Sequence, residues 1–334
     1  MFTRRQILAA PLGLAACSRS GAPDRPLFVA DAHPDEYPTV QALYALDEIL
    51  DRRTGGEMRV RVYAGGQLGA EKDTLEITVF GGLDLNRINL APLNSIVPET
   101  IVLALPFLFR SIAHLRAVLD GDPGQRILDT LWPHGLKGLC YYDSGARSFY
   151  NTKRPIHSPG DMSDLKIRVQ NSDIYVAMVQ ALGANPTPIP YGEVYQALVQ
   201  GVVDGAENNW PSYESSRHFE VARHYSLTRH VLAPEVLVAS RKTWVKLTPE
   251  QQGHLQAAAR ESVPIMRRTW DQRVADSRER VLAGGVQVVE EVDHEAFSGR
   301  MLPVWDRFLT TPGMKSLAQD IVDFESDEES GYGE

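Results

Sequence analysis

Few residues in this sequence are spaced in a way that could carry catalysis or hold a metal ion. His218, His224 and His230 recur every six residues, but a six-residue step turns about 240° around a helix, so the three rings share no face. Surface or capping positions are the better interpretation of these histidines. Glu193 and Glu207 are of the type needed for an acid–base pair, yet nothing in the sequence brings the two carboxylates together.

The signature motifs of the common enzyme and cofactor classes are absent. The chain has no GxGxxG, GxxxxGK[ST], HExxH, GxSxG or EF-hand loop. Residues 65–69 (GGQLG) precede a predicted helix, where an anion could bind, although a strand-to-helix turn with positive φ is the simpler interpretation. Two cysteines, Cys17 and Cys140, exclude a disulfide framework and a Cys/His zinc site. We therefore expect no cofactor and no metal, and an inert, buried Cys140.

The composition is typical of a globular protein of about two domains. The chain has 334 residues, of which 43% are hydrophobic and 23% charged, enough to bury a sizeable core. The formal net charge of −9 argues against nucleic acid as a partner, because phosphate binding needs clustered Lys and Arg. The longest apolar stretch of the body, residues 101–109, is too short to span a bilayer.

The N-terminus, residues 1–17, is typical of a signal peptide. Arg4 and Arg5 precede a short apolar run at residues 7–16, the arrangement of a secretory signal rather than of a transmembrane helix. Residues 18–26 follow as a linker rich in Ser, Gly and Pro. We predict that the protein is exported to the periplasm.

Two details of this export signal stay open. Residues 3–8 (TRRQIL) resemble the twin-arginine export motif. Residues 14–17 (LAAC) resemble a lipobox, which would make Cys17 a lipidated N-terminus that anchors the protein to the membrane. The same alanine-rich stretch also permits ordinary cleavage.

The body of the chain alternates strand and helix patterns. The first elements follow in the order β-α-β-α-β, which indicates an α/β domain with a parallel sheet; they are a strand at 27–30, a helix from Thr39 to Gly55, a strand at 58–63, a helix at 70–80 and a strand at 83–90. Further strands are predicted at 138–142, 147–151, 166–169 and 286–289, and further helices at 172–182, 191–200, 214–223 and 295–308.

The C-terminal part has a different pattern. Thr248, Pro249 and Glu250 are typical of a helix start, and the polar–apolar pattern that follows predicts one long helix at 249–283 that could brace two domains. Residues 319–334 carry many acids and no base, so we expect a solvated, frayed tail.

Several segments resemble the periplasmic solute-binding proteins of tripartite ATP-independent (TRAP) transporters, of the DctP type. The matching segments are YAGGQLG at 63–69, LPFLF at 105–109, DLKIRV at 164–169, and GEVYQAL followed by GVVDGAEN at 192–208. The last block is long and specific, and the resemblance covers about residues 26–318. Residues 207–213 (ENNWPSY) also resemble the subgroup that binds hexuronates such as glucuronate and galacturonate.

The resemblance implies an α/β, two-domain periplasmic binding protein fold, with a ligand cleft between the domains. Domain I would comprise residues 27–146, 234–248 and 284–318, and domain II residues 147–233, with residues 249–283 as the bracing helix. The implied function is capture of an organic acid, here a hexuronate, and its delivery to the membrane permease of the TRAP transporter. No covalent chemistry is implied, so the protein would not be an enzyme, and we expect a monomer.

The resemblance also implies which residues bind the ligand. Arg168, in KIRV, matches the family's carboxylate clamp, whose planar fork can make two parallel hydrogen bonds; a surface salt bridge is the alternative role. Arg147 matches a second family arginine, and Asn208 an asparagine that donates to the carboxylate. Glu207 is placed to hold an arginine instead. Tyr191 occupies an aromatic position that stacks on the ligand.

Other candidates come from the first domain and from the hexuronate-like segment. Arg87 and Asn89 lie at the C-terminal end of a predicted strand, where α/β proteins bind ligands. Arg87 replaces the family's usual apolar residue and needs a partner, which an oxygen-rich ligand would supply. Candidates for contacts that recognise the ring hydroxyls of the sugar are Asn209, Trp210 and Tyr213. Weaker candidates for the same rim, for which caps and turns are equal alternatives, are Asp31, His33, Tyr37 and Glu71.

Two other functions stay open. A binder of a C4-dicarboxylate or another small organic acid would need few groups that read hydroxyls, so the many Asn, Tyr and Arg candidates favour a sugar acid. A secreted hydrolase acting on acidic sugars would need paired carboxylates at a defined separation, and the sequence offers no convincing pair.

Overall fold

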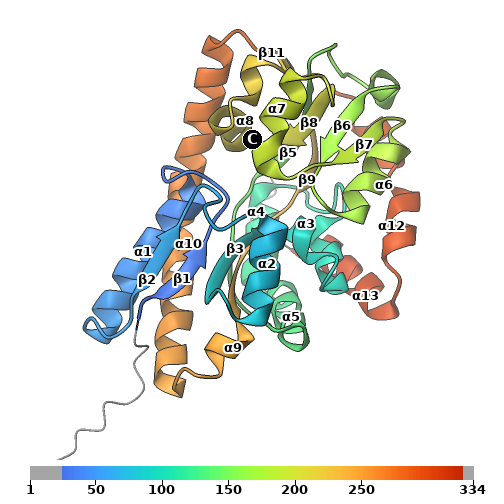
Figure 1. The fold of residues 1–334 in the computed structure, drawn as a ribbon. Helices are drawn as coiled ribbons and strands as arrows, with labels where there is room; N and C mark the ends of the chain where they lie inside the picture. The colour runs from blue at the N-terminus through green and yellow to red at the C-terminus, as the bar shows by residue number, and fades with distance from the viewer. Residues whose placement is uncertain (1–24, 326–334) are drawn as a thin grey trace, which may run out of the picture.

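The computed structural model describes residues 25–325 as two α/β domains, each built on one sheet (Figure 1). The first sheet has five strands in the order β2-β1-β3-β10-β4, and the second has six in the order β11-β9-β5-β8-β6-β7. The signal peptide at residues 1–17 with Cys17, most of the linker, and residues 326–334 of the acidic tail lie outside the described residues.

The strands of the first sheet come from both halves of the chain. They are β1 (Leu27–Ala30), β2 (Val60–Tyr63), β3 (Leu85–Asn89), β4 (Leu136–Tyr142) and β10 (Glu235–Ser240). Strand β1 pairs in parallel with β2 and β3, which confirms the predicted β-α-β-α-β unit. Strand β10 runs antiparallel between β3 and β4.

The second sheet is formed by β5 (Ala146–Asn151), β6 (Lys166–Val169), β7 (Asn185–Pro188), β8 (Gly205–Asn208), β9 (His224–Leu232) and β11 (Gln287–Val289). The α-helices are α1 (Pro38–Thr54), α2 (Glu71–Phe80), α3 (Leu90–Leu93), α4 (Ile112–Asp120), α5 (Asp122–Thr130), α6 (Asp173–Ala181), α7 (Val194–Val199), α8 (Trp210–Ser215), α9 (Arg241–Trp244), α10 (Pro249–Ala283), α11 (His294–Gly299), α12 (Leu302–Phe308) and α13 (Pro312–Val322). Short 3₁₀ turns are η1 (Pro98–Ala104), η2 (Trp132–His134), η3 (Pro159–Met162), η4 (Tyr191–Glu193) and η5 (His218–Glu220).

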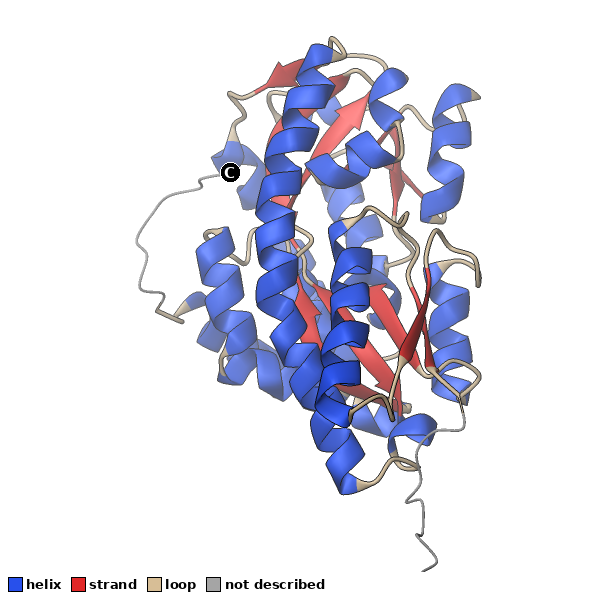
Figure 2. Cartoon of the chain, turned by 90° about the vertical axis from the view of Figure 1, so that its left-hand side faces the viewer, coloured by secondary structure: helices blue, strands red, loops and turns tan. Residues whose placement is uncertain are grey.

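The long helix α10 packs against both domains, as the sequence predicted. A capping box between Thr248 and Gln251 starts it, with Pro249 in its first turn. The helix contacts α1 of the first domain and α8 of the second, and Figure 2 shows it running past both sheets. Trp270 joins the core of the first domain, whereas Val281 joins a core of the second. The helix therefore braces the two domains.

The domains are also joined by the β4–β5 and β9–β10 connections, where the chain crosses from one sheet to the other. We call these two connections the hinge, and β5 and β9 beside them the hinge strands. Gly145 lies in the first of these connections with φ +62°, and a Cβ added there would meet the Trp270 ring at 3.0 Å. Glycine is required at this position because it tolerates a left-handed backbone and occupies no further space.

The prediction that residues 284–318 belong wholly to domain I is wrong. Strand β11 pairs in parallel with β9 in the second sheet, and α12 packs against α6 of the second domain. Only α13 returns to the first domain, where it contacts α5 and η1. The reason is that α10 ends beside the second sheet, so the residues that follow it pack on the second domain before the chain returns to the first.

Three predicted helix boundaries are also wrong. The helix predicted at 214–223 is only the end of α8, because Arg217 takes a left-handed conformation with φ +60° before η5. The helix predicted at 295–308 is divided into α11 and α12. The predicted tail begins too early, since residues 319–322 belong to α13 and Arg110 donates hydrogen bonds to the carbonyls of Val322 and Phe324.

Other features of residues 25–325 bear on function. None of their helices combines the length and the apolar character needed to cross a membrane. Within the same range, His, Cys, Asp and Glu side chains form no group of three or more that could hold a metal ion. Cys140 is buried, as predicted, and burial raises the pKa of its thiol to about 12, so the thiol stays protonated and unreactive.

Candidate ligand-binding site

A cavity lies between the two domains and is lined by residues from both. Its volume is about 10 Å³, and the hollow beside it adds about 260 Å³. The first domain supplies Ala32, His33, Glu71, Asn89 and Glu235, and the hinge and second domain supply Ser144, Arg147, Gln170, Tyr191, Asn208 and Ser212. Glu71, Gln170 and Tyr191 also line an adjoining hollow that contains Arg168. The cavity and this hollow together form the cleft where the carboxyl ends of β3 and β6 meet.

Arg168 is a buried cation without a carboxylate partner in the described chain. The residue lies on β6 and is only 2% exposed. Its Nε donates to the carbonyl of Ile189 at 2.8 Å, and no ion pair within residues 25–325 involves its guanidinium. Burial lowers the pKa of Arg168, although the nearby Glu207 acts to raise it. A buried charge is costly without a partner, so the two Nη groups are set to receive an anion.

Arg147, on β5, is already neutralised by the protein. Its Nε donates to Glu207 Oε2 at 2.5 Å and its Nη2 to Glu207 Oε1 at 2.8 Å, a bidentate pair. Burial would raise the pKa of Glu207, but Arg147 and His230 beside it lower it to about 2. Glu207 therefore holds an arginine, as the sequence suggested, and Arg147 keeps only part of its donor capacity for a ligand.

Asn208 and Asn89 present amide donors to the cavity. Asn208 Oδ1 accepts from Arg147 Nη1 at 2.9 Å and from the backbone N–H of Asn209. Asn89 Oδ1 accepts from the backbone N–H of Ala91 at the start of α3. Because both oxygens are occupied, each Nδ2 is the end left for a ligand, and both residues line the cavity.

Arg87 has a different environment from the one that the sequence suggested. Its partners are supplied by the chain and not by a ligand: the guanidinium bonds Asp31, Glu71 and Glu235 and also contacts His33 Nδ1 at 2.8 Å. The Arg87 side chain is fully buried and is not among the residues that line the cavity. The prediction of direct ligand contact by Arg87 is therefore wrong, although its neighbours His33, Glu71 and Glu235 do line the cavity.

Contacts across the cleft hold the domains together in this structure. Tyr37 OH lies 2.8 Å from Ser212 Oγ, and Asn94 Nδ2 donates to Ser172 Oγ at 2.9 Å. The Tyr191 ring lies 5.2 Å from the His33 ring, measured between centroids. Tyr191 thus covers the cavity from the second domain, and the cleft is in a closed arrangement.

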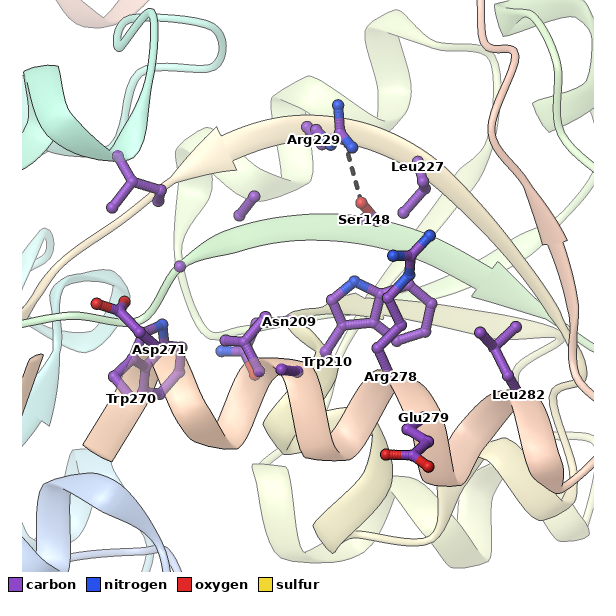
Figure 3. A pocket seen from close by; sticks show the side chains of 15 residues that line it. Ser148, Asn209, Trp210, Leu227, Arg229, Trp270, Asp271, Arg278, Glu279 and Leu282 are labelled. Atoms are coloured by element: carbon purple, nitrogen blue, oxygen red, sulfur yellow. Dashed lines mark hydrogen bonds between the residues drawn. The ribbon is translucent and has the colours of Figure 1, made fainter. Parts of the chain in front are cut away.

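Trp210 does not face this cavity. Its ring stacks on Tyr225 with centroids 4.0 Å apart, and it lines a separate groove between α10 and strands β5 and β9 (Figure 3). The groove has a volume of about 500 Å³ and includes Trp270 and Leu282 of α10. It lies on the α10 side of the hinge strands and contains neither Arg168 nor Asn208, so we do not assign the ligand to it.

Asn209 and Tyr213 also have structural roles. Asn209 Oδ1 caps α8 by accepting from the backbone N–H of Ser212, and its Nδ2 donates to the carbonyl of Ser144. Tyr213 is fully buried and its OH donates to the carbonyl of Ala222. The prediction that Asn209, Trp210 and Tyr213 bond ring hydroxyls is wrong, because Asn209 caps α8, Tyr213 is buried inside the domain and Trp210 lines the groove beside α10.

The sequence missed other cavity residues, of which Glu235 is the most informative. Glu235 is the first residue of β10, a strand that was not predicted, and it is 2% exposed. The available signal for it was an acidic residue directly before the apolar segment of EVLVAS. Ser144, Gln170 and Ser212 carried no such signal. His218 and His230 are both buried, and the His230 ring stacks on Phe149 with centroids 4.1 Å apart, so the prediction of surface or capping positions is wrong for both.

The fold consists of two α/β domains that close over a cleft and are joined by hinge strands. The cleft contains a buried arginine, Arg168, that no carboxylate of the described chain pairs. These features define a solute-binding protein of the two-domain type. Residues 29–311 match the family model of bacterial extracellular solute-binding protein, family 7 (DctP). The chain belongs to this family.

Relatives and solved structures agree with this assignment. A TRAP periplasmic solute-binding protein from Bradyrhizobium sp. BTAi1, in complex with α/β-D-galacturonate, is 53% identical with a TM-score of 0.89, covering 90% of this chain and 100% of that chain. One from Roseobacter denitrificans with bound β-D-glucuronate is 40% identical with a TM-score of 0.88, covering 90% and 100%. A solute-binding protein from Chromohalobacter salexigens is 41% identical over 295 residues, 88% of each chain.

Proposed function

We propose that this protein captures a hexuronate, such as galacturonate or glucuronate, by its carboxylate and delivers it to the membrane permease of a TRAP transporter. The observation that carries the proposal is Arg168, a buried guanidinium in the interdomain cleft whose Nη groups have no carboxylate partner within residues 25–325. The similarity to galacturonate-bound and glucuronate-bound proteins supports a sugar acid as the ligand.

Each polar group of a bound hexuronate would have a partner among the side chains of the cleft. The ligand carboxylate would accept two parallel hydrogen bonds from the Arg168 fork, with the Asn208 amide as a further donor. The Asn89 amide, His33 and the first-domain carboxylates would bond the ring hydroxyls. Tyr191 would cover the sugar ring when the domains close.

A C4-dicarboxylate is the second candidate, because a C4-dicarboxylate-binding periplasmic protein from Rhodobacter capsulatus is 30% identical over 269 residues, covering 78% of this chain. Of the three buried arginines in the described chain, Arg87 and Arg147 are paired with the protein's own carboxylates and only Arg168 is not. One unpaired cation suits a ligand with one carboxylate, which favours the hexuronate.

We further propose a periplasmic monomer that performs no covalent chemistry and is exported by the signal at residues 1–17. Mass spectrometry of the protein purified from its native membrane and periplasmic fractions would decide between ordinary cleavage and lipidation of Cys17. Light scattering would test the monomer.

Titration calorimetry with the mature protein tests the ligand. We expect one-to-one binding of galacturonate or glucuronate, binding of succinate at least tenfold weaker, and no detectable binding of neutral galactose. Tight succinate binding without a uronate signal would overturn the hexuronate proposal. The uronate should be recovered unchanged after incubation, and a turnover product from a glucuronide would favour the hydrolase instead.

A further inference from the structure

We infer that the first-domain wall of the cavity rejects a second carboxylate, so that the protein binds a uronate but excludes the aldarate of the same sugar. An aldarate differs in carrying a carboxylate at both ends. This inference rests on the proposed function and adds a basis for specificity at the end of the cavity that belongs to the first domain. The wall is formed by Asp31, Glu71 and Glu235 around Arg87.

The wall carries more negative than positive charge. Three carboxylates contact one guanidinium. Their side chains are largely withdrawn from solvent, with 0% exposure for Asp31, 15% for Glu71 and 2% for Glu235. Burial acts to raise the pKa of Asp31, but Arg87 and His33 beside it lower that pKa below its usual range, so this carboxylate is ionised. The Arg147–Glu207 pair across the cavity is neutral as a unit and does not offset the excess.

Arg87 has no capacity left for a ligand anion. Its Nη1 donates to Glu71 and Glu235, and its Nη2 donates to Asp31 and contacts His33 Nδ1. The one unpartnered group, Nε, belongs to a side chain with no exposed surface. Arg87 therefore acts as a positioning residue, which fixes the carboxylates and does not bind the ligand itself.

Free acceptors remain on two of these carboxylates. Glu71 Oε1 accepts from Arg87 and from the backbone N–H of Asn89, and Glu235 bonds Arg87 through Oε2. No hydrogen bond from the described residues reaches Glu71 Oε2 or Glu235 Oε1, and both residues line the cavity. These oxygens can accept from a hydroxyl, whereas a ligand carboxylate would meet them with a like charge and no proton to donate.

His33 belongs to the same wall. Its Nδ1 lies 2.8 Å from Arg87 Nη2 and 3.1 Å from Asp31 Oδ1, so this nitrogen contacts the wall, and the ring lines the cavity. Lys72 lines the same adjoining hollow as Arg168. Among the residues that line the cavity itself, the one Lys or Arg is Arg147, which Glu207 already pairs.

Calorimetry on paired ligands tests this inference. Galacturonate would be compared with galactarate, and glucuronate with glucarate, so that each pair shares its configuration at C2 to C5; because the aldarate is an open chain, the Gln variants of the wall separate the effect of its charge from that of its missing ring. We expect each aldarate to bind at least about 100-fold more weakly than its uronate, because like charges juxtaposed without solvent strongly disfavour a complex. An aldarate that binds within about threefold of its uronate would overturn the inference and leave the proposed function intact. Failure of both uronates to bind would instead overturn the proposed function, and the inference with it.

Variants of the wall assign the effect to its residues. Glu71→Gln and Glu235→Gln each remove one charge and keep the shape, so we expect either one to reduce the uronate-to-aldarate ratio by about tenfold. Glu76→Gln, on the exposed face of the same helix as Glu71, is the matched control and should leave the ratio unchanged. A ratio that stays at its wild-type value in both folded wall variants would overturn the assignment. If either variant fails to fold, as circular dichroism would show, the other one and the wild-type ratio still decide.

Discussion

Replacing Arg168 by lysine is expected to weaken hexuronate binding by about 10- to 100-fold. Arg168 Nε is held by the Ile189 carbonyl, which leaves both Nη groups for the ligand carboxylate. Lysine keeps the charge but has no fork, so at least one charge-assisted hydrogen bond is lost, worth about 1.5–3 kcal/mol. Each 1.4 kcal/mol changes a dissociation constant about tenfold. The half-buried Ile189 carbonyl also loses its donor, which places the expected loss toward the upper end.

Titration calorimetry with galacturonate and glucuronate measures this loss directly. Arg300→Lys is the matched control, because Arg300 is exposed and the same substitution there should leave the dissociation constant unchanged. Circular dichroism and the melting temperature must first show that Arg168→Lys is folded. Binding within about threefold of wild type, less than one such bond is worth, would refute the role of Arg168 as carboxylate clamp.

Three further outcomes follow from the geometry. Glu207 has a pKa of about 2 in the folded protein against 4.5 ordinarily. Its ionised carboxylate therefore adds about 3 kcal/mol to the free energy of unfolding above pH 4.5, and this contribution is lost as the pH falls toward 2. Urea unfolding of wild type should show this dependence of the unfolding free energy on pH, and Glu207→Gln should flatten it. Gly145→Ala should lower the stability by about 1–3 kcal/mol in thermal or urea unfolding, because its Cβ would meet Trp270 at a backbone φ of +62°; an unchanged stability would contradict the hinge packing. Small-angle scattering should show a smaller radius of gyration with saturating galacturonate than without it, since the Tyr37–Ser212 contact spans the closed cleft; identical curves would refute ligand-driven closure.

The sequence predicts the local parts of the fold well. The first βαβαβ unit follows from short-range patterns, namely alternating apolar residues at 60–63 and glycines after the first two helices. Strand β7 escapes prediction because its sequence NPTP contains two prolines, which only an edge strand tolerates. Strand β8, with the sequence GAEN, is buried yet polar, because its Glu207 and Asn208 are satisfied by Arg147 from another strand.

The site is predictable where a motif carries it and not where distant segments meet. Arg168, Arg147 and Asn208 follow from matching segments, and the structure places all three at the cleft. The partners of Arg87 come from β1, α2 and β10, so no local pattern could show that the protein itself neutralises this arginine. Trp210 was predicted from the resemblance of residues 207–213 to a hexuronate-binding subgroup, but the start of α8 directs it to the opposite side of the hinge.

The most direct test of the central claim is a crystal structure of the mature protein with galacturonate. We expect the sugar in the interdomain cleft, with both carboxylate oxygens within hydrogen-bond distance of Arg168 Nη1 and Nη2 and with hydroxyls facing Glu71 and Glu235. A sugar bound in the groove between α10 and the hinge strands, or one whose carboxylate faces Glu235 instead of Arg168, would contradict it.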